Sequence, residues 1–186
     1  MLYKKKKIYL LLYQLVTEIQ WPAAMLGSGK TFLVIVPLIL LLEDWEHRLK
    51  SSGTRYSVFW YGTRIFPNFP IVLATIDLAI KSYLIKCIGN AYACENFGGV
   101  VIDEVHDVLV SCEFWDCMWS VWQLWTLPFL VIAMSGTLPI HIKAPLILEL
   151  CLQPDTIIVQ KSSNRSELQY HIESALKSPN DLQKCI

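Results

Sequence analysis

The sequence predicts a single α/β domain with a mostly parallel sheet. Its 186 residues correspond to about one domain. Short runs rich in Val, Ile and Leu alternate along the chain with amphipathic stretches, and strands that alternate with helices form parallel sheets with right-handed connections. Hydrophobic residues make up 54% of the sequence and charged residues 17%. This composition excludes a disordered chain and suits strands that are buried on both faces.

Six short apolar runs are the predicted strands. The run 32–38 is rich in β-branched residues and ends at Pro37, which favours a buried strand. The other five are 56–61, 71–75, 99–102, 128–134 and 156–159. We expect the segments 34–36, 71–75, 100–102, 129–134 and 156–159 to lie side by side in one sheet.

Helices are predicted between these strands. In 39–50, Trp45 and Leu49 belong to an apolar stripe at helical spacing opposite charged residues, and the pattern stops near Gly53. Residues 1–20 are predicted to be a basic, amphipathic helix. The other predicted helices are 78–88, 112–124 and 140–150, and a turn-rich loop is expected at 62–70.

The chain divides into a basic and apolar lead-in (1–22), the α/β domain itself (23–160) and a polar tail (161–186). The formal net charge is zero, so any contact with nucleic acid must come from a local patch. The basic run 4–7 is the obvious candidate. A basic run before an apolar one also imitates a signal peptide, but Gln14 and other polar residues interrupt the apolar run and argue against secretion.

The cysteines and the apolar runs indicate an intracellular protein. The six cysteines show neither a C-x-x-C pair nor zinc-like spacing, so we expect reduced thiols and no zinc site. No stretch reaches the ~18 apolar residues that span a bilayer, so we expect no membrane segment. A small membrane-surface protein that uses the basic run 4–7 and its apolar neighbours is a further alternative.

The stretch Gly27–Thr31 matches the end of a phosphate-binding loop. The pattern G-x-x-x-x-G-K-[ST] uses small residues so that backbone N–H groups can close around phosphates. Ala24 takes the first position of this pattern, Lys30 would lie along the β- and γ-phosphates, and Thr31 would offer its hydroxyl to Mg²⁺. The alternative is a Gly-Ser turn followed by an ordinary exposed lysine.

An apolar run that ends in Asp103 and Glu104 is the second motif. An acid at the end of a buried strand lies at the carboxyl edge of an α/β sheet, where ligands bind. We expect Asp103 to hold hydrated Mg²⁺, Glu104 to polarise the attacking water, and His106 to couple this site to the next motif. The alternative is a solvated turn that caps a helix.

Ser135 and Thr137 follow a predicted strand, so their hydroxyls are expected at the same edge as the acids. There they could bridge His106 or Asp103 to a surface that faces nucleic acid. The alternative is a Ser-Gly-Thr turn in which Thr137 caps the next helix. On this prediction Gly29, Asp103 and Ser135 lie along one edge of the sheet.

In this order, the motifs make the chain resemble the first RecA-like lobe of a superfamily 2 helicase, with a DEAD/DEAH-box-like ATP-binding domain. More narrowly, it resembles the RecQ-type helicases found in many copies in fungal genomes. The matching stretches are 27–31 (motif I), 34–38 (Ia), 71–75 (Ib), 103–106 (II), 135–139 (III) and 163–170, the lead into a second lobe. The resemblance implies a three-layer P-loop NTPase fold, ATP and Mg²⁺ as cofactors, DNA as partner, 3′-to-5′ unwinding, and work in DNA repair or recombination in the nucleus.

The resemblance also assigns roles to residues. The expected catalytic residues are Glu104, Asp103, His106 and Lys30. The expected nucleotide-binding residues are Ala24, Gly27, Ser28, Gly29, Lys30, Thr31, Ser135 and Thr137. The expected Mg²⁺ ligands are Thr31 and Asp103.

Departures from the family pattern indicate a weak or decayed enzyme. Thr31 is followed almost directly by the predicted strand at 34–36, whereas the family places a helix there whose N-terminus supplies much of the phosphate affinity. The second lobe, with the arginines that complete the ATPase site, is not encoded in these residues. We therefore expect weak ATP binding, negligible turnover and weak binding to single-stranded DNA, with a second lobe as a partner in trans. The alternative is a non-enzymatic helicase remnant that acts at most as a binding or interaction domain.

Overall fold

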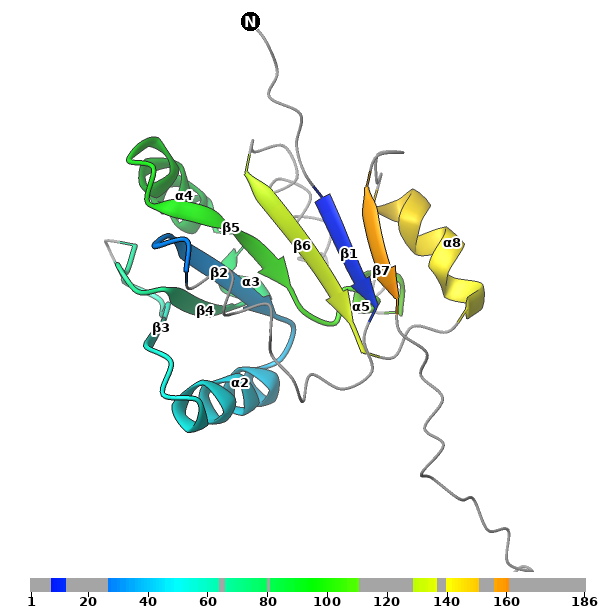
Figure 1. Ribbon diagram of the computed structural model, residues 1–186, viewed down its shortest axis with the longest axis horizontal. Helices are drawn as coiled ribbons and strands as arrows, with labels where there is room; N and C mark the ends of the chain where they lie inside the picture. The colour runs from blue at the N-terminus through cyan, green and yellow to red at the C-terminus, as the bar shows by residue number, and fades with distance from the viewer. Residues whose placement is uncertain are drawn as a thin grey trace, which may run out of the picture.

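The computed structural model describes residues 8–12, 27–63, 66–79, 81–110, 129–136, 140–150 and 156–160. They form one sheet with flanking helices (Figure 1). The strands are β1 (Ile8–Leu12), β2 (Thr31–Val36), β3 (Tyr56–Val58), β4 (Ile71–Thr75), β5 (Phe97–Ile102), β6 (Leu130–Ser135) and β7 (Ile157–Gln160). The helices in the described residues are α2 (Ile39–Ser51), α3 (Ile76–Ala79), α4 (Ser82–Ala93), α5 (Asp107–Val110) and α8 (Ile140–Glu149).

The strands of the sheet follow the order β3-β4-β2-β5-β6-β1-β7, and each neighbouring pair is parallel. Because all the strands run the same way, their carboxyl ends share one edge of the sheet and their amino ends share the opposite edge. The predicted α/β class with a mostly parallel sheet is confirmed.

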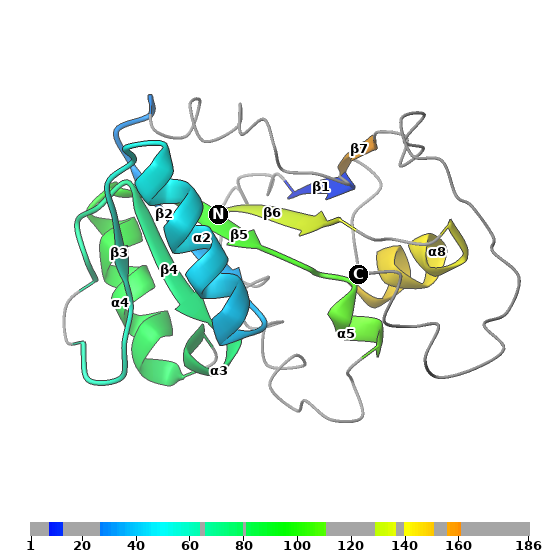
Figure 2. The ribbon, with the colours of Figure 1, turned by 90° about the horizontal axis from the view of Figure 1, so that it is seen from below.

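Alternate residues of the central strands face two different cores, as the two-residue period of a strand requires. In β2, Leu33 and Ile35 face one core, while Phe32 and Val34 face the other. Helix α2 covers the second core, and helices α3, α4 and α8 contribute to the first. Figure 2 shows α2 and α4 at the end of the sheet that carries β3 and β4, and α8 toward the other end. Helices on both faces of the sheet complete the predicted three layers.

Most predicted elements are confirmed to within a few residues. The predicted helix 39–50 is α2, and the predicted strand 71–75 is β4. The helix predicted at 78–88 is instead two helices, α3 and α4, because the backbone at Lys81 is extended. Within the described part of the chain, no helix has the length and apolar character needed to cross a bilayer.

The prediction for the first segment is wrong. Residues 8–12, expected within a helical lead-in, form β1 between β6 and β7. Ile8–Leu12 has no charged side chain and so lacks the polar face of an amphipathic helix, whereas a continuous apolar run suits a strand inside a parallel sheet. Of the five segments expected side by side, four are adjacent as β4, β2, β5 and β6, and β1 separates the fifth, β7, from β6. The predicted helix 112–124 and the tail 161–186 lie outside the described residues.

Candidate functional site

The acidic motif lies at the carboxyl edge of the sheet. Asp103 follows the last residue of β5, and Ser135 is the last residue of the neighbouring strand β6. The Asp103 N–H donates to the Ile35 carbonyl of β2 at 2.9 Å. The Val105 N–H donates to the Met134 carbonyl of β6 at 2.8 Å. Backbone hydrogen bonds therefore tie this loop to both strands that flank β5.

A side-chain cluster joins this loop to the end of β6. Glu104 has a left-handed backbone with φ of 46°. Its Oε2 lies 3.1 Å from His106 Nδ1 and accepts a 3.4 Å hydrogen bond from the Gly136 N–H. Ser135 Oγ lies 2.8 Å from the same Nδ1. The geometry thus brings together Glu104, His106 and Ser135, three of the predicted site residues.

The contact between Glu104 and His106 changes both pKa values. The hydrogen bond with His106 lowers the pKa of Glu104, against the opposing effect of burial. The same contact raises the pKa of His106. Both side chains are therefore charged between the ordinary pKa values of a glutamate and a histidine, and they form an ion pair there.

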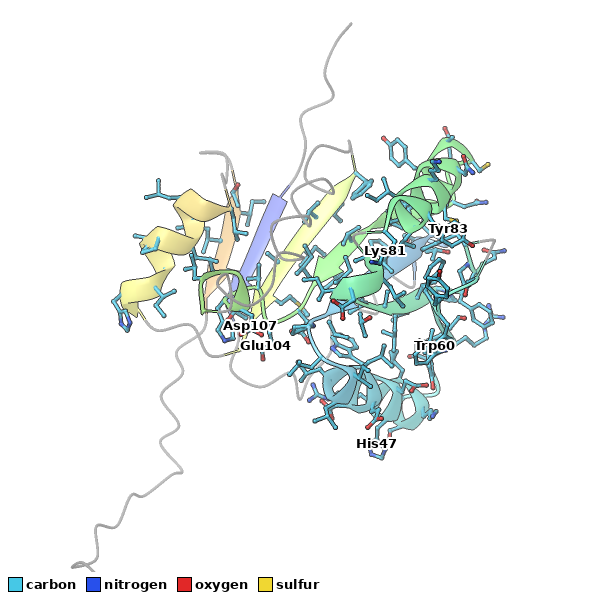
Figure 3. All side chains as sticks on the ribbon, turned by 180° about the vertical axis from the view of Figure 1, so that it is seen from behind. His47, Trp60, Lys81, Tyr83, Glu104 and Asp107 are labelled. Atoms are coloured by element: carbon cyan, nitrogen blue, oxygen red, sulfur yellow. The ribbon has the colours of Figure 1, made fainter. Side chains whose placement is uncertain are left out.

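A serine, a histidine and an acid also suggest a nucleophilic triad, but the geometry excludes one. In such a triad the histidine contacts the serine through one ring nitrogen and the acid through the other. Here Glu104 and Ser135 both lie against Nδ1, while Nε2 is 3.6 Å from Asp107, beyond hydrogen-bond length. Ser135 is only 2% exposed, so a substrate cannot reach its hydroxyl. Figure 3 shows Glu104 and Asp107 beside each other.

Asp103 is held by two N–H donors. Trp45 Nε1 donates to Oδ2 at 2.7 Å, and the Glu104 backbone N–H donates to Oδ1 at 2.9 Å. Burial raises the pKa of Asp103, and the hydrogen bond from Trp45 is the largest opposing cause. The sequence places Trp45 on the buried stripe of its helix but carries no signal for this contact, which joins positions 58 residues apart.

The glycine loop lies at the opposite edge of the sheet. Thr31 is the first residue of β2 and pairs with Phe97 at the start of β5. Gly29 has a positive φ of 68°, and Ser28 Oγ accepts a 3.2 Å hydrogen bond from the Lys30 N–H. The loop is thus an exposed turn that precedes a strand, as in the alternative interpretation of this motif.

The prediction that Gly29 shares an edge with Asp103 and Ser135 is therefore wrong. The register of β2 against β5 places Lys30 about six residue steps from Asp103, which is roughly 20 Å at the rise of a parallel strand. The cause is visible in the sequence. Since β2 begins at Thr31 itself, no helix separates the loop from the strand, and the loop lies at the strand's amino end.

Several predicted contact residues lie outside the described residues. They are Ala24 and Thr137 of the nucleotide site, and the basic residues 4–7 and Arg64.

Strand β1 also ends at the carboxyl edge of the sheet, which carries the acids and is called the acidic edge below. Its last residue, Leu12, pairs with Ser135.

The residues described at the carboxyl edge do not fit a complete Mg²⁺–ATP site. Triphosphate binding needs backbone N–H groups and a lysine beside the acids, and Lys30 is at the other edge. Both oxygens of Asp103 already accept N–H groups. Among the described residues, no three His, Cys, Asp or Glu side chains gather as metal ligands. The roles of Lys30, Thr31 and Asp103 toward ATP and Mg²⁺ therefore stay predictions.

The parallel sheet with helices on both faces and an acidic loop at its carboxyl edge defines an α/β fold of the RecA-like type. No protein-family model matches the sequence, and no curated protein sequence matches it. Solved structures do match. The hypothetical ATP-dependent RNA helicase from Sulfolobus tokodaii aligns with a TM-score of 0.53 and 17% identity, over 81% of this chain and 48% of that one. The Hef helicase domain from Pyrococcus furiosus aligns with a TM-score of 0.48 and 11% identity, over 82% of this chain and 34% of that one.

At 17% identity, the likeness to the Sulfolobus tokodaii structure concerns the fold. It supports the RecA-like α/β fold of this sheet and its flanking helices. The chain spans about half the length of that solved chain, so the activity of a whole helicase is a matter for proposal.

Proposed function

We propose that this chain is a RecQ-like helicase lobe that does not hydrolyse ATP and that binds single-stranded DNA in the nucleus. The observation that carries the proposal is the separation of Lys30 and Asp103, which lie at opposite edges of the sheet. In a working motor the lysine contacts the phosphates while the acid holds their Mg²⁺, so both residues lie next to one nucleotide. Lys30 and Asp103 are separated by about six residues of strand, roughly 20 Å, which is too far for both to contact one nucleotide.

The rest of the proposal follows from the resemblance in the motifs. Unwinding in the 3′-to-5′ direction requires two lobes that close on ATP, so we do not expect it from this lobe alone. A second helicase lobe on another chain is a proposed partner. A part in DNA repair or recombination rests on the same resemblance.

An exposed aromatic pair supports the DNA-binding part of the proposal. Trp60 and Tyr61 are 53% and 90% exposed in the turn after β3. Two hydrogen bonds close the turn: Thr63 Oγ1 accepts the Trp60 N–H at 3.2 Å and donates to the Trp60 carbonyl at 2.8 Å. β3 is parallel to β4, so this turn lies at the carboxyl edge, well away from Glu104 (Figure 3). Exposed aromatic rings on a turn are suited to stacking on bases.

Aromatic packing joins the segment before this turn to the start of α4, which carries the basic residue Lys81. The ring of Phe59, which precedes Trp60, packs on Tyr83 with centroids 5.9 Å apart. Lys81, exposed at the start of α4, is two residues before Tyr83. The aromatic turn and Lys81 together offer stacking and one phosphate contact, which is consistent with weak, sequence-independent binding.

The first prediction concerns ATP. The full chain is expected to release no phosphate above background at millimolar Mg²⁺–ATP, because the loop lysine Lys30 lies at the opposite edge of the sheet from Asp103 and Glu104. Lys30→Ala and Glu104→Gln should match the unmodified protein in both calorimetric titration with Mg²⁺–ATP and phosphate release. Measurable turnover that Lys30→Ala removes would show that the glycine loop reaches the acids, and would overturn the non-hydrolytic assignment.

The second prediction concerns DNA. The double change Trp60→Ala and Tyr61→Ala should weaken binding to a fluorescent single-stranded oligonucleotide by roughly tenfold or more, since each stacked base contributes about 1–3 kcal/mol. The matched control is Phe69→Ala, an exposed aromatic residue in the turn before β4 at the opposite edge. If the Trp60/Tyr61 double variant and Phe69→Ala lose the same affinity for the oligonucleotide, or if neither loses any, the aromatic turn is not the DNA contact.

A further inference from the structure

Helix α2 depends on tertiary contacts for its position. Its N-cap residue Leu38 makes no side-chain hydrogen bond to the first turn. Its buried residues Leu42, Trp45 and Leu49 pack on the sheet, and apolar packing alone fixes position and register loosely because it is not directional. Directional polar contacts add to this packing by favouring one position of the helix.

Two hydrogen bonds link α2 to the rest of the protein near its middle. Glu46 Oε1 accepts a 2.8 Å hydrogen bond from the Tyr56 hydroxyl of the edge strand β3. The other contact is the 2.7 Å hydrogen bond from the Trp45 indole N–H to Asp103 at the carboxyl edge of the central strand β5. An indole can only donate a hydrogen bond, so a buried tryptophan is best placed beside an acceptor such as this carboxylate.

Asp103 is connected to three parts of the structure at once. Its carboxylate accepts N–H groups from Trp45 on α2 and from Glu104 in its own turn. Its backbone N–H donates to the Ile35 carbonyl of β2. Hydrogen bonds to an ionised carboxylate are shorter and about twice as strong as neutral ones, so this residue is well suited to join helix and sheet.

We infer that Asp103 is the anchor that holds α2 on the sheet, and that Trp45 is its partner, so that this carboxylate does not serve as a Mg²⁺ ligand. Both N–H donors turn their positive ends toward the carboxylate oxygens, where a cation would have to bind. Mg²⁺ keeps several waters and prefers a carboxylate together with phosphate oxygens, and the described part of the acidic edge offers no phosphate cradle. This inference concerns α2 and stands whether or not the lobe binds DNA.

A double-mutant cycle on the full chain tests the pairing. Trp45→Phe removes the N–H donor and keeps an aromatic ring, and Asp103→Asn keeps the shape of the side chain and removes its charge. Each change is expected to lower Tm by roughly 3–10 °C. The double variant should lose clearly less than the sum of the two single losses, because both changes break the same hydrogen bond.

The control for charge removal is Asp44→Asn, on the same helix. Asp44 forms an ion pair with Arg48 on the helix surface, and such exposed pairs contribute little, so its Tm should change by no more than about 2 °C. The inference is refuted if Asp44→Asn lowers Tm as much as Asp103→Asn does. It is also refuted if the Tm losses of the two single variants of the cycle add up strictly in the double variant.

The indole N–H spectrum provides a second readout, which reports on the hydrogen bond itself and not on stability. In a ¹⁵N-labelled sample, the indole N–H signal of Trp45 is the one lost in Trp45→Phe. We expect this signal to move in Asp103→Asn and to stay in place when millimolar MgCl₂ is added, with the Trp60 indole as internal reference. A Trp45 signal that shifts with Mg²⁺, or a Tm that Mg²⁺ raises only when Asp103 is present, would show that the carboxylate binds the ion and would refute the inference.

Discussion

Trp45→Ala is expected to lower the free energy of unfolding by about 4 kcal/mol. Trp45 is 2% exposed and packs between α2 and the central strands, so alanine leaves a large cavity that the stiff sheet cannot fill. The change also removes a donor from the half-buried Asp103 carboxylate, which adds a polar cost. Since a domain of this size has about 5–15 kcal/mol of stability, the variant should unfold at a much lower urea concentration, measured by circular dichroism.

The matched control for this change is Trp60→Ala. It deletes the same side chain from an exposed turn, so the free energy of unfolding should stay within about 0.5 kcal/mol of the unmodified value. Similar losses in the two variants would mean that α2 does not pack on the sheet as described here.

Gly99→Ala is expected to cost about 3 kcal/mol, through overpacking of the central sheet. A Cβ at Gly99 would lie 2.5 Å from the Leu130 backbone oxygen and 2.9 Å from its Cβ. Relief of this clash requires β6 to move away from β5, since a backbone oxygen in a strand cannot rotate aside. The same movement would pull Ser135 away from His106. Thermal unfolding of the variant measures the cost.

Gly89→Ala is the control for the glycine substitution. Gly89 lies in α4 with nothing within 4 Å of the added Cβ, and alanine favours a helix over glycine by up to about 1 kcal/mol. This variant should therefore be slightly stabilised. A Gly99→Ala protein as stable as Gly89→Ala would contradict the close approach of β5 and β6.

Local pattern was enough to predict the central elements. The strand β4 and the helix α2 were located nearly residue for residue, because β-branched apolar runs and a helical apolar stripe reflect the immediate chain. The acidic loop was placed at the carboxyl edge of its strand for a similar reason, since it directly follows an apolar run in a parallel sheet. To predict that Glu104, His106 and Ser135 lie together, only one further condition is needed, namely that β5 and β6 are neighbours in the sheet.

The glycine loop shows where pattern was insufficient. The letters of Gly27–Thr31 match a phosphate loop, but a loop binds phosphate at the acidic edge only if it follows a strand and opens a helix. The short spacing from Thr31 to the apolar run of β2 was the available signal. The prediction that the glycine loop and the acids share an edge rested on the motif match and neglected that spacing. The register of β2 against β5 shows that this prediction is wrong.

The sequence by itself determined the α/β class, the parallel sheet and the position of most elements, because these depend on composition and on periodicity over a few residues. Only the tertiary structure decided that β1 lies between β6 and β7, that Lys30 and Asp103 lie at opposite edges, and that Trp45 donates to Asp103. These three features depend on pairings between segments far apart in the chain. Such pairings are selected by the packing of the whole sheet, and no local window of sequence contains them.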